Sequence, residues 1–172
     1  MDAVKGPDTV RENQLIYLME QYGEALTRMC CVYLQDIALA EDAVQETFVK
    51  TYKALENFRG ESSEKTWLMR IAMNTCKDMR RSAWFKYVDR RVTLECMPSP
   101  AYWATQEQSE LTMEIMRLPR KYMEVVLLYY YQGMTTLDIA SSLQIANQTV
   151  SARLKHAREK LRTTLEGGRY DG

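Results

Sequence analysis

Two closely spaced helical patterns lie between Thr135 and Arg162, and they limit the folds that this chain can adopt. Residues 135–143 form a short, largely apolar pattern, residues 144–147 form a tight connection, and residues 148–162 form a basic pattern of helical period. Two helices joined by so short a turn are typical of a helix-turn-helix. The pattern therefore predicts a helical fold around that motif.

Start and end signals support the first of these two helices. Gly133 suits the end of the preceding helix, where a positive φ is common. Thr135, with Asp138 three residues later, resembles a capping box. Three apolar residues are expected to form the buried side of this helix: Leu137, Ala140 and Leu143.

The second helix has an apolar side and a basic side. At about 100° per residue, its apolar residues fall on one narrow face that must pack on a core: Val150, Leu154, Ala157, Leu161 and Leu165. Residues 147–165 carry five basic side chains and one acidic, a net charge of 5 − 1 = +4, which favours binding to DNA through counterion release. The residues expected to contact bases lie in the first two turns: Gln148, Ser151, Ala152, Lys155 and His156, flanked by Arg158.

A surface helical hairpin with a solvated charged face is the alternative interpretation of residues 135–162. Charge alone does not separate the two interpretations. The spacing of the two helices, their end signals and the one-sided basic charge together favour DNA binding.

A net charge of zero conceals an uneven distribution of charge along the 172 residues. Residues 1–63 carry 6 basic and 11 acidic side chains (net −5), and residues 64–91 carry 8 and 3 (net +5). Residues 92–119 carry 1 and 4 (net −3), and residues 120–172 carry 8 and 5 (net +3). Two basic blocks separated by acidic ones predict two contacts with nucleic acid and other surfaces for protein partners.

Length and the N-terminal residues exclude other classes of protein. A chain of 172 residues forms one medium domain or two small ones, and the sequence has no run of about 18 apolar residues to span a membrane. The segment that begins at Met1 does not resemble a signal peptide, so a cytoplasmic protein is expected.

The four cysteines and the single histidine do not form a metal-binding pattern. Cys30, Cys31, Cys76 and Cys96 have no C-x-x-C spacing, so we expect no metal site. The adjacent Cys30 and Cys31 are most simply buried thiols in a reducing compartment, with a redox role as the alternative. Without a glycine-rich phosphate loop or a set of catalytic side chains, we expect no enzyme activity, no catalytic residue, no cofactor and no small-molecule substrate.

The predicted fold is all-α, with two small helical domains joined by a flexible linker. The first domain, residues 1–82, contains three apolar rows of helical period that can close a small core. The periodicity fails in the linker, residues 83–106, where the prolines of residues 97–100 cannot continue a helix. The second domain, residues 107–172, contains the helix-turn-helix.

A second basic face is predicted on the helix around Trp67. Six residues are expected to point away from the apolar side of that helix: Thr66, Arg70, Met73, Lys77, Arg80 and Arg81. The cations can hold phosphates, Asn74 at the edge can hydrogen-bond a base, and Phe58 in the preceding loop can stack on an unpaired base. From the residues alone, a solvated charged face and a core phenylalanine are the simpler alternatives.

Together, these segments resemble the bacterial extracytoplasmic-function (group IV) RNA polymerase sigma factors. The resemblance covers about residues 10–166, apart from the linker. The similar segments follow the family's order, which makes the match specific: 41–50, 58–60 and 66–74 in region 2, then 118–120, 138–140 and 149–158 in region 4.

The resemblance implies roles for three sets of residues. The set that would dock on the polymerase β′ clamp is Asp42, Gln45 and Glu46. The set that would hold a flipped base and the melted strand of the −10 element is Phe58, Arg59, Gly60, Glu61, Ser62, Ser63, Arg70, Asn74, Lys77, Arg80 and Arg81. The set that would face the −35 element in the major groove is Gln148, Ser151, Ala152, Lys155, His156 and Arg158.

The resemblance also implies partners. These are the RNA polymerase core, through its β′ clamp and β flap, promoter DNA, and an anti-sigma factor, often membrane-bound, that covers the polymerase-binding or DNA-binding surfaces. The chain departs from the family at Ser151, where arginine or lysine is frequent, and at His156, where arginine is frequent.

The expected function is that of a dissociable polymerase subunit that recognises −10 and −35 promoter elements and starts DNA melting. The alternative is a stand-alone helix-turn-helix regulator, which would dimerise and bind duplex DNA unaided, yet the sequence offers no obvious dimer helix. A helical adaptor that binds only protein is a further alternative. It predicts that neutralising Lys155 or Arg80 leaves DNA binding unchanged.

Overall fold

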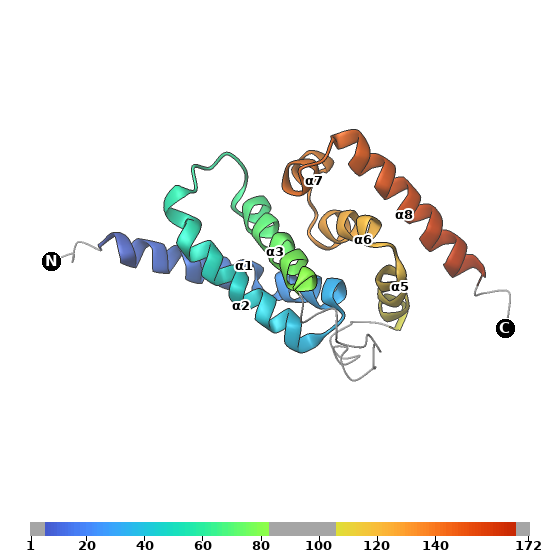
Figure 1. The fold of residues 1–172 in the computed structure, drawn as a ribbon, viewed down its shortest axis with the longest axis horizontal. Coiled ribbons are helices and arrows are strands. Elements are labelled where there is room, and N and C mark those ends of the chain that lie inside the picture. The colour runs from blue at the N-terminus through green and yellow to red at the C-terminus, as the bar shows by residue number, and fades with distance from the viewer. Residues whose placement is uncertain (1–5, 83–105, 168–172) are drawn as a thin grey trace.

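The computed structural model describes residues 6–82 and 106–167, and every regular element in these two ranges is helical (Figure 1). This confirms the predicted all-α fold with two helical units. The predicted linker, residues 83–106, lies outside the described residues except for Gln106, where a helix begins.

The first unit is a bundle of three long helices. α1 spans Pro7–Leu34, α2 spans Ile37–Ala54, and α3 spans Glu64–Arg81. A short 3-10 turn, η1 at Leu55–Asn57, follows α2 and leads into the loop before α3.

Local capping determines where two of these helices begin. The Asp36 carboxylate accepts a hydrogen bond from the Leu39 N–H at 2.9 Å at the start of α2. The Ser63 hydroxyl accepts one from the Thr66 N–H at 3.1 Å at the start of α3. Each such cap stabilises a helix by about 1 kcal/mol.

The first unit buries an apolar core between α1 and the two helices that pack on it. Its largest fully buried side chains come from α1 and α3: Leu18, Leu26, Met29, Leu68, Met69 and Met73. Burial of an aliphatic side chain of this size contributes about 1.5–3 kcal/mol. This core holds α3 in place and so fixes which of its side chains are left on the outside.

The second unit contains four helices and one π-helical turn. α5 spans Gln106–Arg117, and α6 spans Arg120–Val126 and continues into the π-helical turn η4 at Leu127–Tyr131. α7 spans Thr136–Leu143 and α8 spans Asn147–Gly167. The last two form the helix-turn-helix that the spacing predicts.

The end signals predicted before α7 are confirmed. Gly133 has a φ of +63°, and the Thr135 hydroxyl accepts a hydrogen bond from the Asp138 N–H at 3.1 Å. The expectation that Leu137 faces the core is wrong, because its side chain is 67 % exposed. Ile139, one residue outside the predicted row, is fully buried instead, so the buried side of α7 is rotated from the one expected.

The two units pack against each other, because α7 contacts α3 and α5 contacts α1. Two side-chain amides bridge the units: Gln35 Nε2 donates to the Met116 carbonyl at 2.8 Å, and Gln132 Nε2 donates to the Ala25 carbonyl at 3.0 Å. α1 begins at one end of the molecule and α8 ends at the other. In the part of the chain that the structure describes, no helix has the length and apolar character needed to cross a bilayer.

Candidate nucleic-acid interface

The core side of α8 matches the prediction over its first three turns. Val150, Leu154 and Ala157 are buried, and Leu161 is partly buried against the core. Leu165 is 39 % exposed, so the expectation that it faces the core is wrong for the last turn, where it lines an open groove with Leu111. The opposite side of α8 is therefore free to meet a partner along most of the helix.

The predicted −35 residues are all exposed on α8. Arg158 is directed differently from the rest, because its Nε donates to the Tyr130 hydroxyl at 2.6 Å and its guanidinium lies 5.7 Å from the centre of that ring. His156 lies 6.1 Å, ring centre to ring centre, from Tyr122 and lines a groove of about 550 Å³ beside it. The exposed surface thus consists mainly of the N-terminal half of α8, where base contacts are expected.

The loop before α3 brings an aromatic pair to the surface. The Phe58 and Trp67 ring centres lie 4.6 Å apart, and both rings are partly buried. Gly60, with a φ of +71°, allows the loop to turn, and the loop residues Arg59 to Ser63 are exposed or partly exposed. Phe58 therefore packs on a neighbour and still lines a cavity of about 440 Å³ beside the loop.

α3 carries the predicted cations, but they do not share one environment. Asn74 and Arg81 are exposed, whereas Arg70, Lys77 and Arg80 are partly covered. Two other residues expected on this outer face are buried, Thr66 at 3 % and Met73 at 1 % exposure, so the prediction that they are solvent-facing is wrong. The physical reason is that α3 is packed on several sides, by α1 and α2 of its own unit and by α7 of the second unit.

A buried carboxylate lies at the centre of this contact. Glu124 of α6 is 8 % exposed, its Oε2 lies 3.2 Å from Lys77 Nζ, and its Oε1 accepts a hydrogen bond from the Tyr33 hydroxyl at 3.2 Å. The Tyr33 ring also lies 5.6 Å from the Arg80 guanidinium and 5.1 Å from that of Arg120. Burial, helped by the neighbouring Glu124 carboxylate, raises the pKa of Tyr33 to about 12.

Sequence analysis missed two residues of this contact, Glu124 and Ser141. Glu124 lies in a run of apolar residues, 122–129, and an acid in such a run is seldom buried without a partner, which is a usable signal. Ser141, at the surface of α7, accepts a hydrogen bond from Arg70 Nη2 at 2.7 Å. Nothing in the local sequence indicates that bond, because its two residues come from different units.

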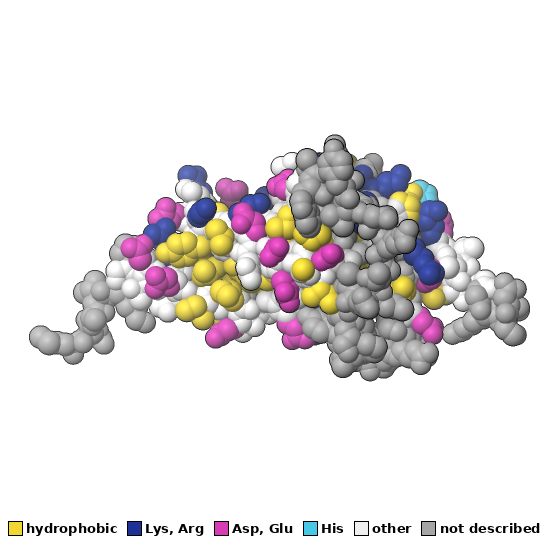
Figure 2. Space-filling model, turned by 60° about the horizontal axis from the view of Figure 1, so that its bottom comes forward, with side chains coloured by type: hydrophobic (Ala, Val, Ile, Leu, Met, Phe, Trp, Pro, Cys, Tyr) yellow, Lys and Arg dark blue, Asp and Glu magenta, His cyan; other side chains and the backbone are white. Residues whose placement is uncertain are grey.

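The predicted polymerase-docking residues form an exposed acidic and polar row on α2. Asp42, Gln45 and Glu46 are all exposed. Beside them, an apolar groove of about 700 Å³ runs between α1 and α2; its lining includes Met19, Phe48 and Val49. Figure 2 shows a hydrophobic area on this face with acidic side chains around it.

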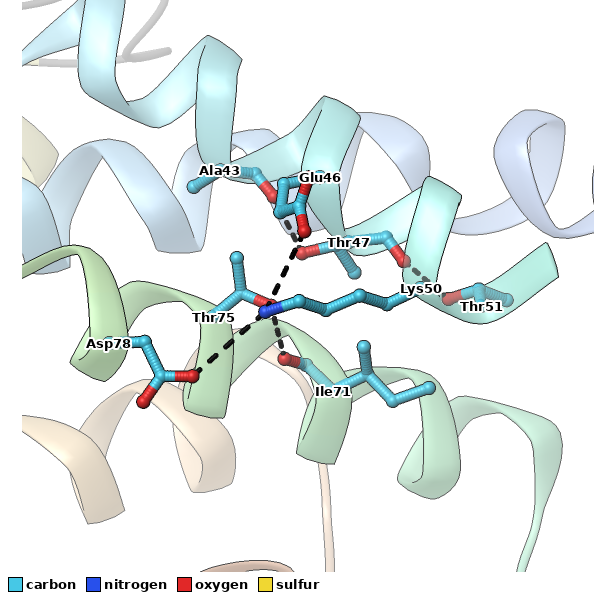
Figure 3. A network of polar contacts seen from close by, with 8 residues as sticks. All are labelled: Ala43, Glu46, Thr47, Lys50, Thr51, Ile71, Thr75 and Asp78. Carbon is cyan, nitrogen blue, oxygen red and sulfur yellow. Dashed lines mark hydrogen bonds and ion pairs between the residues drawn. The ribbon is translucent and has the colours of Figure 1, made fainter. Parts of the chain in front are cut away.

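Lys50 connects this helix to α3. Its Nζ lies 3.9 Å from both Glu46 Oε1 and Asp78 Oδ2, and donates to the Thr75 hydroxyl at 3.3 Å (Figure 3). Thr47 and Thr51, next to it on α2, donate hydrogen bonds from their hydroxyls to backbone carbonyls of their own helix, as Figure 3 shows. These contacts fix the position of α2 relative to α3. The exposed row on α2 and the basic face of α3 therefore keep their relative positions.

The described cysteines are free thiols inside the first unit. Cys30, Cys31 and Cys76 are buried, and the sulfurs of Cys30 and Cys76 lie 3.5 Å apart. Burial raises the pKa of Cys31 to about 11, and the hydrogen bond with Cys76, together with burial, raises the pKa of Cys30 well above its usual value. Cys96 lies outside the described residues. In residues 6–82 and 106–167, no cluster of metal-ligating side chains occurs.

Each of the two units matches a family of known proteins. Residues 18–86 match the model of sigma-70 region 2, and residues 108–161 match that of sigma-70 region 4. The RNA polymerase sigma-H factor of Pseudomonas aeruginosa is 31% identical over 163 residues, which is 87% of this chain and 84% of that protein. The extracytoplasmic-function sigma factor SigL of Mycobacterium tuberculosis is 30% identical over 172 residues, covering 96% of this chain and 97% of that one.

Two solved structures have the same fold. The sigma factor RpoE of Bartonella quintana, in complex with the anti-sigma factor NepR, superposes with a TM-score of 0.74 at 22% identity, covering 90% of this chain and 96% of that one. CnrH, in complex with the cytosolic domain of CnrY, superposes with a TM-score of 0.70 at 22% identity, covering 91% of this chain and 90% of that one.

The chain therefore belongs to the extracytoplasmic-function sigma factors, with sigma-70 regions 2 and 4. Its function is to direct RNA polymerase to promoters. Sigma factors are polymerase subunits and not enzymes, which accords with the sequence-based expectation.

Proposed function

We propose that this sigma factor reads the two promoter elements with two separate surfaces, the exposed side of α8 for the −35 element and the loop before α3, with α3 itself, for the −10 element. The observation that carries the proposal is the side chain arrangement of α8. Its buried row is held in the core while the predicted base-contacting residues stand exposed on the other side.

At the −35 element, the first two turns of α8 enter the major groove. Lys155 and His156 are exposed there, with the small residues Ser151 and Ala152 leaving room for a close approach to base edges. Gln148 adds an amide that can pair with adenine. Arg158, directed to Tyr130, takes a supporting position at the edge of this surface.

At the −10 element, the loop and α3 make different contacts with the DNA. Phe58, beside Trp67, offers an aromatic surface on which an unpaired base can stack, and the loop residues 59–63 surround it. Asn74 is exposed for hydrogen bonding to a base, and the cations of α3 provide contacts to the phosphates of the melted strand: Arg70, Lys77, Arg80 and Arg81.

Two apolar grooves support contacts with the polymerase core. The acidic and polar row on α2, next to the groove between α1 and α2, suits the β′ clamp. A second groove of about 520 Å³, lined by Leu111, Ile115 and Leu161 among others, suits an apolar helix such as that of the β flap.

The structural neighbours support a further partner. The sigma factor RpoE is bound to the anti-sigma factor NepR in one of them, and CnrH is bound to the cytosolic domain of CnrY in the other. By analogy, an anti-sigma factor would cover the polymerase-binding surfaces of this chain in the cytoplasm, held in some cases at the membrane by its own anchor.

The proposed division of labour is tested by selecting promoters from a randomised library with purified core polymerase and each variant. Lys155→Ala is expected to change the base preference within the −35 element by about tenfold, because a base contact contributes about 1–3 kcal/mol. Asn74→Ala is expected to change the preference only within the −10 element.

Lys160→Ala serves as the matched control, because it removes the same charge from an exposed position of α8 beyond the first two turns. It is expected to weaken all promoters alike. If Lys155→Ala and Asn74→Ala also weakened all promoters equally, with no shift in base preference, the assignment of the two surfaces would be wrong.

A further inference from the structure

Arg158, at the edge of the exposed side of α8, is held by a tyrosine of the neighbouring segment η4. Its Nε donates to the Tyr130 hydroxyl at 2.6 Å, and its guanidinium carbon lies 5.7 Å from the centre of the Tyr130 ring and 5.8 Å from that of the Tyr129 ring. The two rings meet edge to face, with their centres 4.9 Å apart. Sequence analysis placed neither tyrosine among the DNA-binding residues, yet both contact this guanidinium.

The backbone of η4 gives Tyr130 a rigid base. The Gln132 N–H donates to the Leu127 carbonyl, five residues earlier, at 3.2 Å, which is the hydrogen bond of a π-helical turn. Leu127 and Leu128 are fully buried, so the core anchors this turn. Tyr130 itself is 53 % exposed, and its hydroxyl therefore meets Arg158 at the surface of the second unit.

The hydrogen bond leaves most of the guanidinium available to a further partner. A guanidinium has five N–H donors, and the contact with Tyr130 uses only the one on Nε. The terminal Nη atoms are the ones with which arginine binds a phosphate through two parallel hydrogen bonds. At about 100° per residue, Arg158 lies on the same flank of α8 as Lys155 and Ser151, about one and two turns away.

A tyrosine is well suited to hold an arginine for an anion. Its hydroxyl is a neutral acceptor, so the arginine keeps its full charge for a phosphate, whereas a carboxylate partner would offset that charge. Arginine also loses rotamer freedom when it is fixed on a ligand. The hydrogen bond to Tyr130 and the contacts with the two rings restrict Arg158 before DNA arrives, which lowers that entropic cost.

We propose that Tyr130 is a positioning residue for promoter binding: its hydroxyl holds Arg158 through Nε, so that the terminal nitrogens of Arg158 meet a phosphate beside the −35 element. The inference rests on the −35 role proposed above for α8. A phosphate contact fixes how α8 sits in the groove and reads no base. The Tyr130 ring also lines the groove proposed for the β flap, so the contact is tested in the assembled polymerase.

The test measures binding of holoenzyme, assembled from core polymerase and the full-length chain, to two fluorescein-labelled promoter duplexes by fluorescence anisotropy. The first duplex contains both promoter elements, and the second is truncated just downstream of the −35 element. Tyr130→Phe keeps the ring and removes the hydroxyl. It is expected to weaken binding to the first duplex about three- to tenfold and to leave binding to the second unchanged.

Two further readouts separate positioning of a phosphate contact from a general structural role. For the first duplex, the plot of log affinity against log salt concentration is expected to become less steep by up to about 1 in Tyr130→Phe, because fewer counterions are released. The base preference within the −35 element, measured by selection from a randomised library, is expected to stay as in the wild type.

Tyr129→Phe is the matched control, because it removes a hydroxyl from the other ring beside Arg158, whose Nε bonds Tyr130 instead. It is expected to bind both duplexes within about twofold of the wild type, since it removes no contact to Arg158 Nε. Arg158→Gln is expected to weaken binding to the first duplex at least as much as Tyr130→Phe does. Adding Tyr130→Phe to Arg158→Gln is expected to cause no further loss, because the two residues act through one contact.

The possible failures are distinguishable. If Arg158→Gln weakens binding to the first duplex but Tyr130→Phe binds it as tightly as Tyr129→Phe does, the positioning role is overturned and the −35 role of Arg158 stands. If Tyr130→Phe weakens binding to both duplexes equally, the tyrosine acts on polymerase docking and the inference is wrong. Unchanged binding by Arg158→Gln would contradict the −35 role of that residue and, with it, the inference.

Discussion

At the scale of a residue, Glu124 shows how a buried charge is stabilised in a small helical protein. Its carboxylate has two partners, Lys77 and the Tyr33 hydroxyl, and each comes from a different helix of the other unit. Removal of one partner of such a pair costs more than the pair contributes, because the remaining charge is left buried.

The buried cysteines lead to a prediction at the same scale. In a Cys96→Ser variant at pH 8, we expect none of the three remaining thiols to react with Ellman's reagent within minutes, because burial holds Cys30, Cys31 and Cys76 away from the reagent and the pKa of Cys31, at about 11, leaves little thiolate. All three are expected to react in guanidinium chloride. One thiol that reacts rapidly in the native protein would show that the α1–α3 core opens readily.

At the scale of an element, the stability of α7 depends strongly on the interactions at its ends. It has eight residues, too few to be stable by propensity alone, and it is held by the Thr135 cap, by the turn at Gly133 and by packing on α8 and α3. The same helix positions α8 and contacts Arg70. Its stability therefore bears on both proposed DNA surfaces.

Two glycine substitutions are expected to act in opposite directions. Gly133→Ala should destabilise the protein by about 1 kcal/mol, because a φ of +63° is unfavourable for alanine although the space beside it is open. Gly23→Ala, in the middle of α1, where the added methyl group has nothing within 4 Å beyond the backbone of its own helix, should stabilise it by about 0.5–1 kcal/mol. Urea unfolding curves measure both changes, and equal signs for the two variants would contradict the conformational argument.

At the scale of the whole molecule, the two units share a boundary at which α1 and α3 meet α5, α6 and α7. Tyr33 lies at this boundary and is 3 % exposed, with Glu124, Arg80 and Arg120 around its ring and hydroxyl. Its protonated phenol therefore helps to hold the two units together.

Alkaline pH is expected to destabilise the folded chain through Tyr33. The pKa of Tyr33 is raised to about 12 in the folded chain, mainly by burial, against about 10 in an unfolded one. The stabilisation is therefore complete below pH 10 and is lost as the pH rises toward 12. Urea unfolding between pH 9 and pH 11 should show a smaller loss of stability for Tyr33→Phe than for the wild type. Parallel losses in the two proteins would mean that Tyr33 is not protected at the boundary.

Local sequence patterns predicted much of the fold and the exposed side of α8, which is the proposed −35 surface. The helical period of residues 148–157 predicted which side of α8 is buried, and the caps before α7 were visible as Gly133 and Thr135. The loop before α3 and the exposed position of Asn74 also agree with expectation. These features depend on residues a few positions apart, and the geometry of a helix or a cap is set over that distance.

Local sequence patterns were enough to predict that the chain is helical, that it has two units and that each presents cations. The packing of α7 on α3, the burial of Met73 and Thr66, and the pairing of Lys77 with Glu124 depend on how the helices pack in three dimensions. The reason is physical. The sequence of a helix shows which of its sides is apolar. Lys77 and Glu124, however, are 47 residues apart (124 − 77), and their pairing depends on how the two units meet. Neither periodicity nor local charge contains that information.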